Sequence, residues 1–408
     1  MMKKLTLATI IGLIASPVIA KEEAEVMHWW TSGGESAAIK VLAESFEAQG
    51  GTWKDSAVAG GSNARSAAMN RMLGGSPTTA ALFNTSQQYH EMIAEGMLNN
   101  IDDVATANNW EQILPEPTLN AIKVDGHFYA APVNIHMPGW FWYSKDAFEK
   151  AGIDKEPQTI DELFASLDKL KSAGYIPLAL GGQNWQENLL FATVLSNVGG
   201  KQLYLDALGK RDAKTLNSDE FKQVVDTFLK LKPYVDAGSP GRNWNDTTSL
   251  VINDKAGMQI MGDWAKGEFT QANKIPGQDY GCFPGLGDDS LYIVGGDVFV
   301  FPKTDDGAQV AAQKKLVESM LSPETQVKFN NLKGSVPVRT DIDVSSMDVC
   351  AQKGAAILKV AERQVPDGSM LMEEYLYGSL KDAVTEVWNA QNMTTDKAVA
   401  IFTQALRD

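Results

Sequence analysis

Short apolar segments of strand length alternate with longer segments of helical spacing along this chain. The first apolar segment covers residues 25–30, and the helical segment after it starts at Glu35. Its apolar residues repeat on one helix face, at Ala38, Val41, Leu42 and Phe46. Because alternating strands and helices pack as helical layers on a sheet, the pattern predicts an α/β fold.

The alternation continues to the C-terminus without an internal repeat or a low-complexity linker. Strands are predicted at 80–83, 140–143 and 292–300, and helices at 145–151, 161–172 and 221–229. Residues 129–134 are expected to be extended, because Pro132 disfavours helix before it. A chain of 408 residues is long enough for two domains. Without a visible linker, we expect the chain to cross between them more than once.

One apolar strand, residues 258–261, stops abruptly at Gly262-Asp263-Trp264. We expect a turn here, with Asp263 capping the helix that follows. Trp264 then lies at the mouth of the strand, where its flat indole face is available to a flat ligand. The competing interpretation is that this indole is simply part of the core.

The first twenty residues have the pattern of a secretory signal peptide. Lys3 and Lys4 precede an apolar stretch over residues 5–14, and small residues lead up to Ala20. A retained membrane anchor is the alternative, but the stretch is too short to span a bilayer. No Cys follows it to carry a lipid. The sequence therefore predicts a signal peptide at 1–20 and an exported, periplasmic protein without membrane insertion.

The charge balance limits the classes of partner. The chain has 36 Lys and Arg against 51 Asp and Glu, a formal net charge of −15 at pH 7. Loss of Lys3 and Lys4 with the signal peptide makes it more negative. Such a surface repels nucleic acid and anionic lipid, so neither is an expected partner.

Two cysteines, Cys282 and Cys350, are present. In an oxidising compartment an even pair indicates one disulfide, which would stabilise the fold by roughly 4 kcal/mol. Two free buried thiols are the alternative. With four His and no Cys-x-x-Cys, no metal site is predicted. No phosphate loop or dinucleotide fingerprint occurs, so no cofactor is expected.

The positive signal is a set of aromatic, carboxylate, amide and amine residues at the ends of predicted elements. Sugar rings stack their C–H faces on indoles, and their hydroxyls need carboxylate, amide or ammonium partners. The alternative for each Trp alone is a place in the core. The candidate ligand-binding residues are Trp29, Trp30, Glu35, Gln87, Gln88, Trp185, Trp244, Trp264, Asp297 and Lys333.

Catalysis has weaker support in the sequence. The four histidines have no triad partner at a recognisable spacing, so we expect structural or surface roles for His28, His90, His127 and His136. Glu35 and Asp297 are the pair that a glycoside hydrolase would use, but the sequence does not give their separation. The chain is therefore predicted not to be an enzyme, with a secreted glycoside hydrolase as the alternative.

Four segments resemble the extracellular sugar-binding proteins of bacterial ABC importers, closest to the glucose- and mannose-binding members. Their order and spacing match over essentially the whole chain after the signal peptide. The segments are Trp29–Glu35; 141–153 with 156–163 and 173–178; Gly257–Trp264; and 295–297 with 333–337.

The resemblance implies a type II periplasmic binding protein, with two α/β lobes, a multi-segment hinge and the ligand cleft between them. The N-lobe would combine 21–131 with 295–340, and the C-lobe 132–294 with 341–408. Crossings are expected near 129–134, near 293–300 and after Pro337. Such a protein, expected to be a monomer, closes on a sugar and delivers it to a membrane permease. A sugar sensor for a chemoreceptor is the alternative partner arrangement.

The resemblance also implies roles for single residues. Similar proteins stack the sugar between two Trp that match Trp244 and Trp264. Polar contacts would fall to Trp30, Glu35, Gln87 or Gln88, Asp297 and Lys333. Glucose-binding relatives carry a His where this chain has Ser369-Met370-Leu371-Met372. Because a thioether cannot donate to a hydroxyl, a modified or differently substituted sugar becomes more plausible than glucose.

Overall fold

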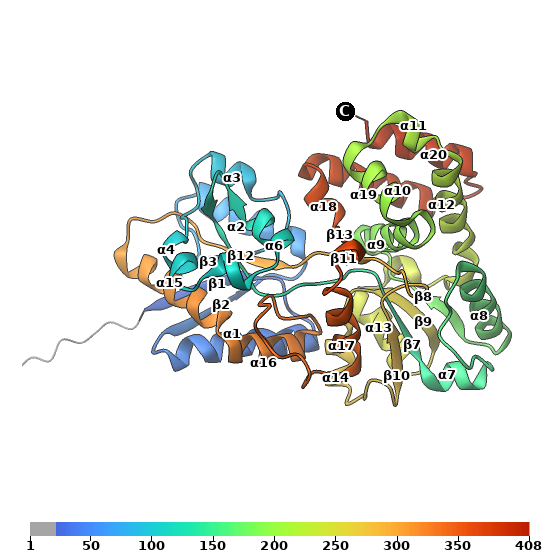
Figure 1. Cartoon of the computed structure of the whole chain (residues 1–408), viewed down its shortest axis with the longest axis horizontal. Coiled ribbons are helices and arrows are strands. Elements are labelled where there is room, and N and C mark those ends of the chain that lie inside the picture. The colour runs from blue at the N-terminus through green and yellow to red at the C-terminus, as the bar shows by residue number, and fades with distance from the viewer. Residues whose placement is uncertain (1–21, 408) are drawn as a thin grey trace, which may run out of the picture.

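The computed structural model describes residues 22–407, and these form two lobes that lie side by side (Figure 1). The predicted signal peptide at 1–20 lies outside the described residues. Within residues 22–407, no helix is both long and apolar enough to cross a membrane. Each lobe is built on one sheet covered by helices, so the predicted α/β class is confirmed.

The first lobe, on the left of Figure 1, contains a five-stranded sheet and is called here the five-stranded lobe. β1 lies parallel to β2 and β3, whereas β12 is antiparallel to β3 and β6. Because β12 enters antiparallel, its first residue lies beside the last residue of β3. In spatial order the strands are β2 (Thr52–Ala57), β1 (Glu23–His28), β3 (Ala80–Asn84), β12 (Asp297–Val300) and β6 (Ala130–Pro132).

Helices from two distant parts of the chain cover this sheet. α1 packs on α16, which follows it by nearly three hundred residues (Figure 1). A short hairpin of β4 (Lys123–Val124) and β5 (His127–Phe128) follows α6. The helices are α1 (Gly33–Ala48), α2 (Gly61–Leu73), α3 (His90–Ala94), α4 (Asp102–Ala107), α5 (Trp110–Ile113), α6 (Glu116–Ile122), α15 (Gly307–Leu321) and α16 (Pro323–Lys333).

The second lobe is built on four strands and is called here the four-stranded lobe. β7 is antiparallel to both of its neighbours, and β8 is parallel to β9. Every residue of β9 is buried, in agreement with a sequence that has one polar residue, Gln259. The strands, in order, are β10 (Tyr280–Phe283), β7 (Trp140–Ser144), β9 (Ala256–Met261) and β8 (Ile176–Ala179).

The helices of the four-stranded lobe include the C-terminal part of the chain, drawn in red in Figure 1. Their apolar faces meet in stacked and edge-on aromatic pairs, such as Phe191 with Phe402. The helices are α7 (Lys145–Lys150), α8 (Ile160–Ser172), α9 (Asn184–Val194), α10 (Gly200–Leu205), α11 (Ala213–Leu216), α12 (Asp219–Lys230), α13 (Trp244–Ile252), α14 (Ala265–Gln271), α17 (Val349–Ile357), α18 (Gly368–Leu371), α19 (Glu374–Asn389) and α20 (Thr395–Ala405).

A disulfide fastens α17 to the four-stranded sheet. Cys282 on β10 is bonded to Cys350 on α17, across a sequence separation of 68 residues. Lys353, one turn further along α17, donates to the carbonyl oxygen of Cys282 and pairs with Glu156. The free-thiol alternative does not apply to this structure, because both cysteines are bonded.

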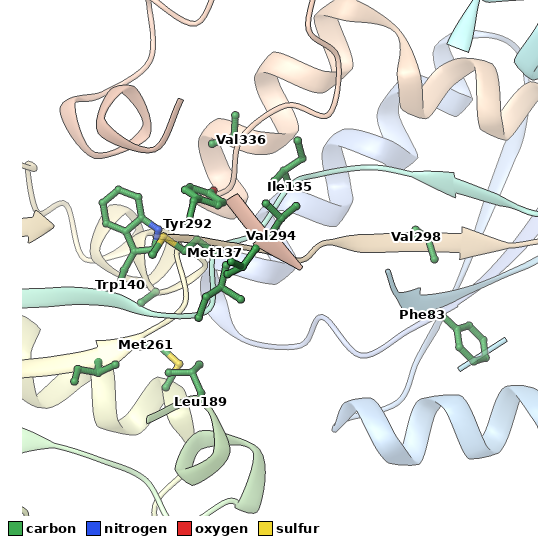
Figure 2. Packing of buried hydrophobic residues seen from close by; sticks show 14 of the residues in the cluster. Phe83, Ile135, Met137, Trp140, Leu189, Met261, Tyr292, Val294, Val298 and Val336 are labelled. Atoms are coloured by element: carbon green, nitrogen blue, oxygen red, sulfur yellow. The ribbon is translucent and has the colours of Figure 1, made fainter. Parts of the chain in front are cut away.

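Three extended segments connect the two lobes and pair with one another. Ile135 exchanges backbone hydrogen bonds with Val336, and His136 exchanges them with Gly295. Figure 2 shows the side chains of Ile135, Met137 and Val294 gathered at this crossing, with Tyr292 beside them. We call residues 133–137, 294–297 and 334–338 the crossover segments.

Two predicted boundaries were wrong. The strand expected at 292–300 is divided into β11 (Tyr292–Val294) and β12, because Gly295 pairs with His136 between them. β11 instead pairs with β13 (Gln364–Pro366) near the C-terminus. The helix expected from Glu35 begins at Gly33, because Ser32 caps it.

Candidate functional site

The candidate site forms where strand ends of both sheets meet the crossover segments. β1 and β3 are parallel, so their carboxyl ends lie at one edge of the five-stranded sheet. β12 begins at that edge, with Asp297 directly opposite Asn84. β9 of the other lobe ends at Met261, followed by Asp263 and Trp264. The register therefore brings residues from distant parts of the sequence to one place.

Two buried carboxylates lie on either side of one imidazole. The His136 Nε2 atom lies 2.9 Å from Asp297 Oδ2, and His136 Nδ1 makes a short contact with Asp263 Oδ1. All three side chains are almost completely buried. The predicted role of Asp263 as a helix cap was wrong: α14 has Trp264 as its N-cap residue without a side-chain cap. Asp263 accepts instead from His136 and from the backbone N–H of Met137.

Asp297 is held by amides as well as by the imidazole. Asn134 Nδ2 donates to Asp297 Oδ2 over 2.9 Å, and the Asp297 backbone N–H donates to Asn134 Oδ1 over 2.7 Å. Asn84 Nδ2 donates to the other carboxylate oxygen over 3.2 Å. Burial opposes ionisation, but the His136 and Lys333 charges and the Asn134 bond outweigh it and lower the pKa of Asp297. Asp297 is therefore a fixed, ionised acceptor.

Lys333 occupies the centre of the predicted polar set. Its Nζ atom lies 3.6 Å from Glu35 Oε1, 5.4 Å from the centre of the Trp30 ring and 5.8 Å from that of Trp264. α16 ends at Lys333 because Gly334 adopts a φ of +96°, which a side chain would strain. The turn at Gly334 thus sets the position of the ammonium group between the lobes.

Glu35 has both a local and a site role. At the start of α1 the Ser32 hydroxyl caps the helix: it accepts from the Glu35 N–H and donates to Glu35 Oε2 over 3.2 Å. Burial raises the pKa of Glu35, and Asp297 adds to that effect, while Lys333 opposes it. The carboxyl therefore has less negative charge than an exposed Glu at the same pH.

The predicted aromatic residues have different surroundings. Trp264 is partly exposed, with the His136 ring edge-on at 5.2 Å and Trp185 tilted at 6.1 Å. Trp30 is buried and packs against Phe299 and Phe329. Trp264 and Trp185 therefore form an accessible aromatic pair, whereas Trp30 lies within the five-stranded lobe.

Arg65, which lies over the Trp29 ring, was not predicted from the sequence. The guanidinium of Arg65, on α2, lies 5.4 Å from the centre of the Trp29 ring and donates to Asn84 Oδ1 over 3.0 Å. Burial lowers the pKa of Arg65, against the charges of Glu374, Tyr377 and Asp297. Because Glu374 and Tyr377 belong to the other lobe, Arg65 faces across the gap between lobes.

Three further predicted residues, Gln87, Gln88 and Trp244, lie in other surroundings. Gln87 donates to the backbone carbonyls of Ser369 and Met370. Gln88 has a buried side-chain oxygen without a hydrogen-bond partner. Trp244 is partly exposed at the start of α13, where its backbone N–H donates to Gln183 Oε1.

The two lobes are in direct contact where α1 meets α14. The Gly34 N–H, at the start of α1, donates to Glu268 Oε1 on α14 over 2.9 Å. A Cβ atom at Gly34 would lie 2.6 Å from the carbonyl carbon of Gly267, nearer than atoms can approach. The contact between α1 and α14 therefore depends on glycine at this position.

His136, Asn134, Asp263 and Arg65 were not among the predicted site residues. His136 is separated from Asp263 by 127 residues and from Asp297 by 161. No spacing rule links residues so far apart, so the sequence offered no signal for them. Among residues 22–407, no group of three or more His, Cys, Asp or Glu is arranged to hold a metal ion.

Comparison with known proteins shows the family of the chain. A family model for "Bacterial extracellular solute-binding protein" matches residues 30–327. A "Probable sugar-binding periplasmic protein" of Rhizobium meliloti is 37% identical over 411 residues, which cover 98% of this chain and 97% of that protein. A protein of the same description from Mesorhizobium japonicum is 37% identical over 420 residues and is covered completely.

Solved structures share the two-lobed architecture. The bacterial solute receptor AcbH, described as having an exclusive preference for β-D-galactopyranose, has a TM-score of 0.80 at 18% identity, over 94% of this chain and 97% of that one. At such identity the likeness shows a common fold and carries no information about the ligand of this chain.

Proposed function

The chain belongs to the bacterial extracellular solute-binding proteins, and we propose that it captures a neutral monosaccharide or small oligosaccharide in the periplasm and delivers it to the permease of an ABC importer. Its fold is that of the type II periplasmic binding proteins, which the sequence resemblance implied. The description of the two relatives as probable sugar-binding proteins supports this ligand class.

The observation that carries the proposal is the meeting of an accessible indole with fixed polar groups. Trp264 is partly exposed, and the Lys333 ammonium lies 5.8 Å from its ring centre. Asp297, ionised and held from three sides, lies on the opposite lobe. An indole face suits the C–H face of a pyranose, and a carboxylate and an ammonium suit its hydroxyls.

Charge supports a neutral ligand. The charged groups of the site have partners of opposite charge. Glu35 pairs with Lys333, Asp263 and Asp297 lie on either side of His136, and Arg65 faces Glu374. A ligand of either sign would therefore meet no uncompensated partner and would be desolvated at a cost.

The proposed mechanism is closure of the two lobes about the crossover segments. In this proposal residues 21–131 with 295–340 move as the N-lobe, and 132–294 with 341–408 move as the C-lobe. A sugar that touches both lobes only when they are closed shifts the population toward that state. The permease then distinguishes closed from open protein, which acts as a monomer.

For the sugar itself we propose a hexose of the glucose or mannose type, with a substitution near the Ser369–Met372 segment. The family histidine is absent there, and Gln87 contacts the backbone of this segment. Without an imidazole donor, a ligand hydroxyl at this position has one partner fewer. Removal or substitution of that hydroxyl should therefore cost little affinity.

Calorimetric titration with a carbohydrate panel tests the proposal. The panel should include glucose, mannose, galactose, their deoxy and amino derivatives and small oligosaccharides. Specific binding of at least one neutral sugar is expected, with a change in Trp emission. Tight binding of a peptide or a metal ion, together with no response to any sugar, would refute it.

Two alternatives predict different results. A glycoside hydrolase would release product from aryl glycosides, and Glu35→Gln would abolish that release. A chemoreceptor ligand would use the same site, so only the membrane partner separates it from a transport protein. Loss of sugar uptake with intact chemotaxis, in cells lacking this protein, favours transport.

A further inference from the structure

His136 is the only imidazole in the described part of the chain that connects the two lobes. It lies on a crossover segment, between Asp297 at the start of β12 and Asp263 after the end of β9. Its ring also lies edge-on to Trp264 at 5.2 Å. One side chain therefore touches the carboxylate of one lobe and both the carboxylate and the indole of the other.

The contacts of the two ring nitrogens agree with a charged imidazole. Nε2 lies 2.9 Å from Asp297 Oδ2 and 3.0 Å from Asn134 Nδ2, and Nδ1 contacts Asp263 Oδ1. Ionised carboxylates only accept, so a proton on each ring nitrogen gives both carboxylates a donor. In that form His136 is an imidazolium that neutralises one of two buried negative charges, and Asn134 donates to Asp297 Oδ2 instead of to the ring.

The other charged groups around His136 agree with this assignment. Burial alone would lower the pKa of His136, and Lys333 at the end of α16 acts in the same direction. The carboxylates of Asp263 and Asp297 outweigh both and raise the pKa above its ordinary value. Glu35 on α1 pairs with Lys333, and Tyr292 on β11, near Asp263, has its pKa raised by burial.

We propose that His136, as an imidazolium, is the positioning residue of the site, which holds Asp297 and Trp264 in their ligand-binding arrangement across the two lobes. It does not itself contact the sugar. The inference rests on the proposed function, because Asp297 and Trp264 are the residues through which the sugar would be bound.

Loss of the proton should disrupt both lobes at once. A neutral imidazole can donate to only one of the two carboxylates, so its other nitrogen would present a lone pair to an anion. The buried carboxylates would also lose their neutralising charge, which favours separation of Asp263 from Asp297. Since the pKa of His136 is raised, the proton-dependent stabilisation is complete at low pH and is lost as the pH rises through that pKa.

The test is the pH dependence of sugar affinity. For the full chain with the best sugar of the panel, Kd should rise about tenfold or more between about pH 7 and about pH 9.5. His136→Gln should bind more weakly at neutral pH and show a flat profile, because Gln carries no titrating proton. His127→Gln is the matched control, since His127 is an exposed imidazole that pairs with Asp102 away from the site.

A flat profile in the natural protein, or the same alkaline loss of affinity in His136→Gln, would overturn the proposal. Failure of the proposed function looks different, because then no sugar binds at any pH.

A second measurement keeps the test decisive if His136→Gln does not fold. The chain has four histidines, so the NMR signal of His136 in labelled protein can be assigned by elimination with single variants at His28, His90 and His127. That signal should titrate above the ordinary histidine range, with a midpoint that matches the loss of affinity. Titration at or below that range would refute the imidazolium.

Discussion

Two tryptophans lie shortly after the ends of central strands, yet their surroundings in the structure differ. Trp30 follows β1 of the five-stranded lobe, and Trp264 follows β9 of the four-stranded lobe. Lys333 lies over both rings, at 5.4 Å and 5.8 Å. Trp30 is only 1% exposed and is enclosed by Phe299 and Phe329, whereas Trp264 remains partly open. The same sequence signal therefore gives a core residue in one lobe and an accessible ring in the other.

The difference comes from what covers each strand end. Phe329 of α16 and Phe299 of β12 pack on Trp30, and α16 is itself packed on α1. Trp264 lies instead beside His136 of a crossover segment and Trp185 of α9, and it stays partly exposed. The position of a Trp after a strand therefore does not by itself decide whether the ring is enclosed or accessible.

The largest change in stability should come from removing the buried indole ring of Trp30. Trp30→Ala should lower the free energy of unfolding by about 3–5 kcal/mol, because it leaves a cavity among packed aromatic rings. Urea denaturation followed by circular dichroism measures this. Trp53→Ala, at a partly exposed position on the edge strand β2, is the control and should cost much less. Equal losses in both variants would contradict the core role of Trp30.

Trp264→Ala should weaken sugar binding more than it lowers stability. Sugar affinity should fall by about 1–3 kcal/mol through loss of a stacking face, while stability changes less than in Trp30→Ala. Calorimetry and urea denaturation on the same preparation separate the two effects. If affinity is unchanged in a folded variant, Trp264 is a core residue like Trp30, and the comparison fails.

Disruption of the contact between α1 and α14 should have a smaller effect on sugar affinity. Gly34→Ala puts a Cβ atom 2.6 Å from the Gly267 backbone, so α1 and α14 can no longer meet. Sugar affinity should fall by about 1–2 kcal/mol, with each lobe still folded. Gly33→Ala is a close control, because its Cβ would meet only side-chain atoms, the nearest at 3.6 Å. Equal affinity of the two variants would show that binding does not need this contact.

The smallest expected change in stability concerns the ionisation of Glu35, which pairs with Lys333 over the Trp30 ring. Because burial raises the pKa of Glu35, the stabilisation that its neutral form provides is complete at low pH and is lost as the pH rises through that pKa. Glu35→Gln should therefore gain stability relative to the natural protein on going from about pH 4 to about pH 8. Urea denaturation at both pH values measures the gain, and Glu47→Gln, exposed near the end of α1, should show none.

Much of the architecture could be predicted from the sequence because it rests on local patterns. The strands ending at Ser144 and Met261 and the helices following Ser32 and Ser144 depend on apolar runs and capping hydroxyls a few residues away. The break at Gly295 was missed because it depends on pairing with His136, which is remote in sequence.

The sequence alone was enough to place aromatic and polar residues at strand ends, since such positions follow from where apolar runs stop. Only the tertiary structure decided that Trp30 is enclosed and Trp264 is open, because burial depends on which helices pack over a strand end. It also placed His136 between two carboxylates, one at the start of β12 and one after the end of β9, in different lobes. Burial and charge are set by contacts between distant residues, and these exist only in the folded chain.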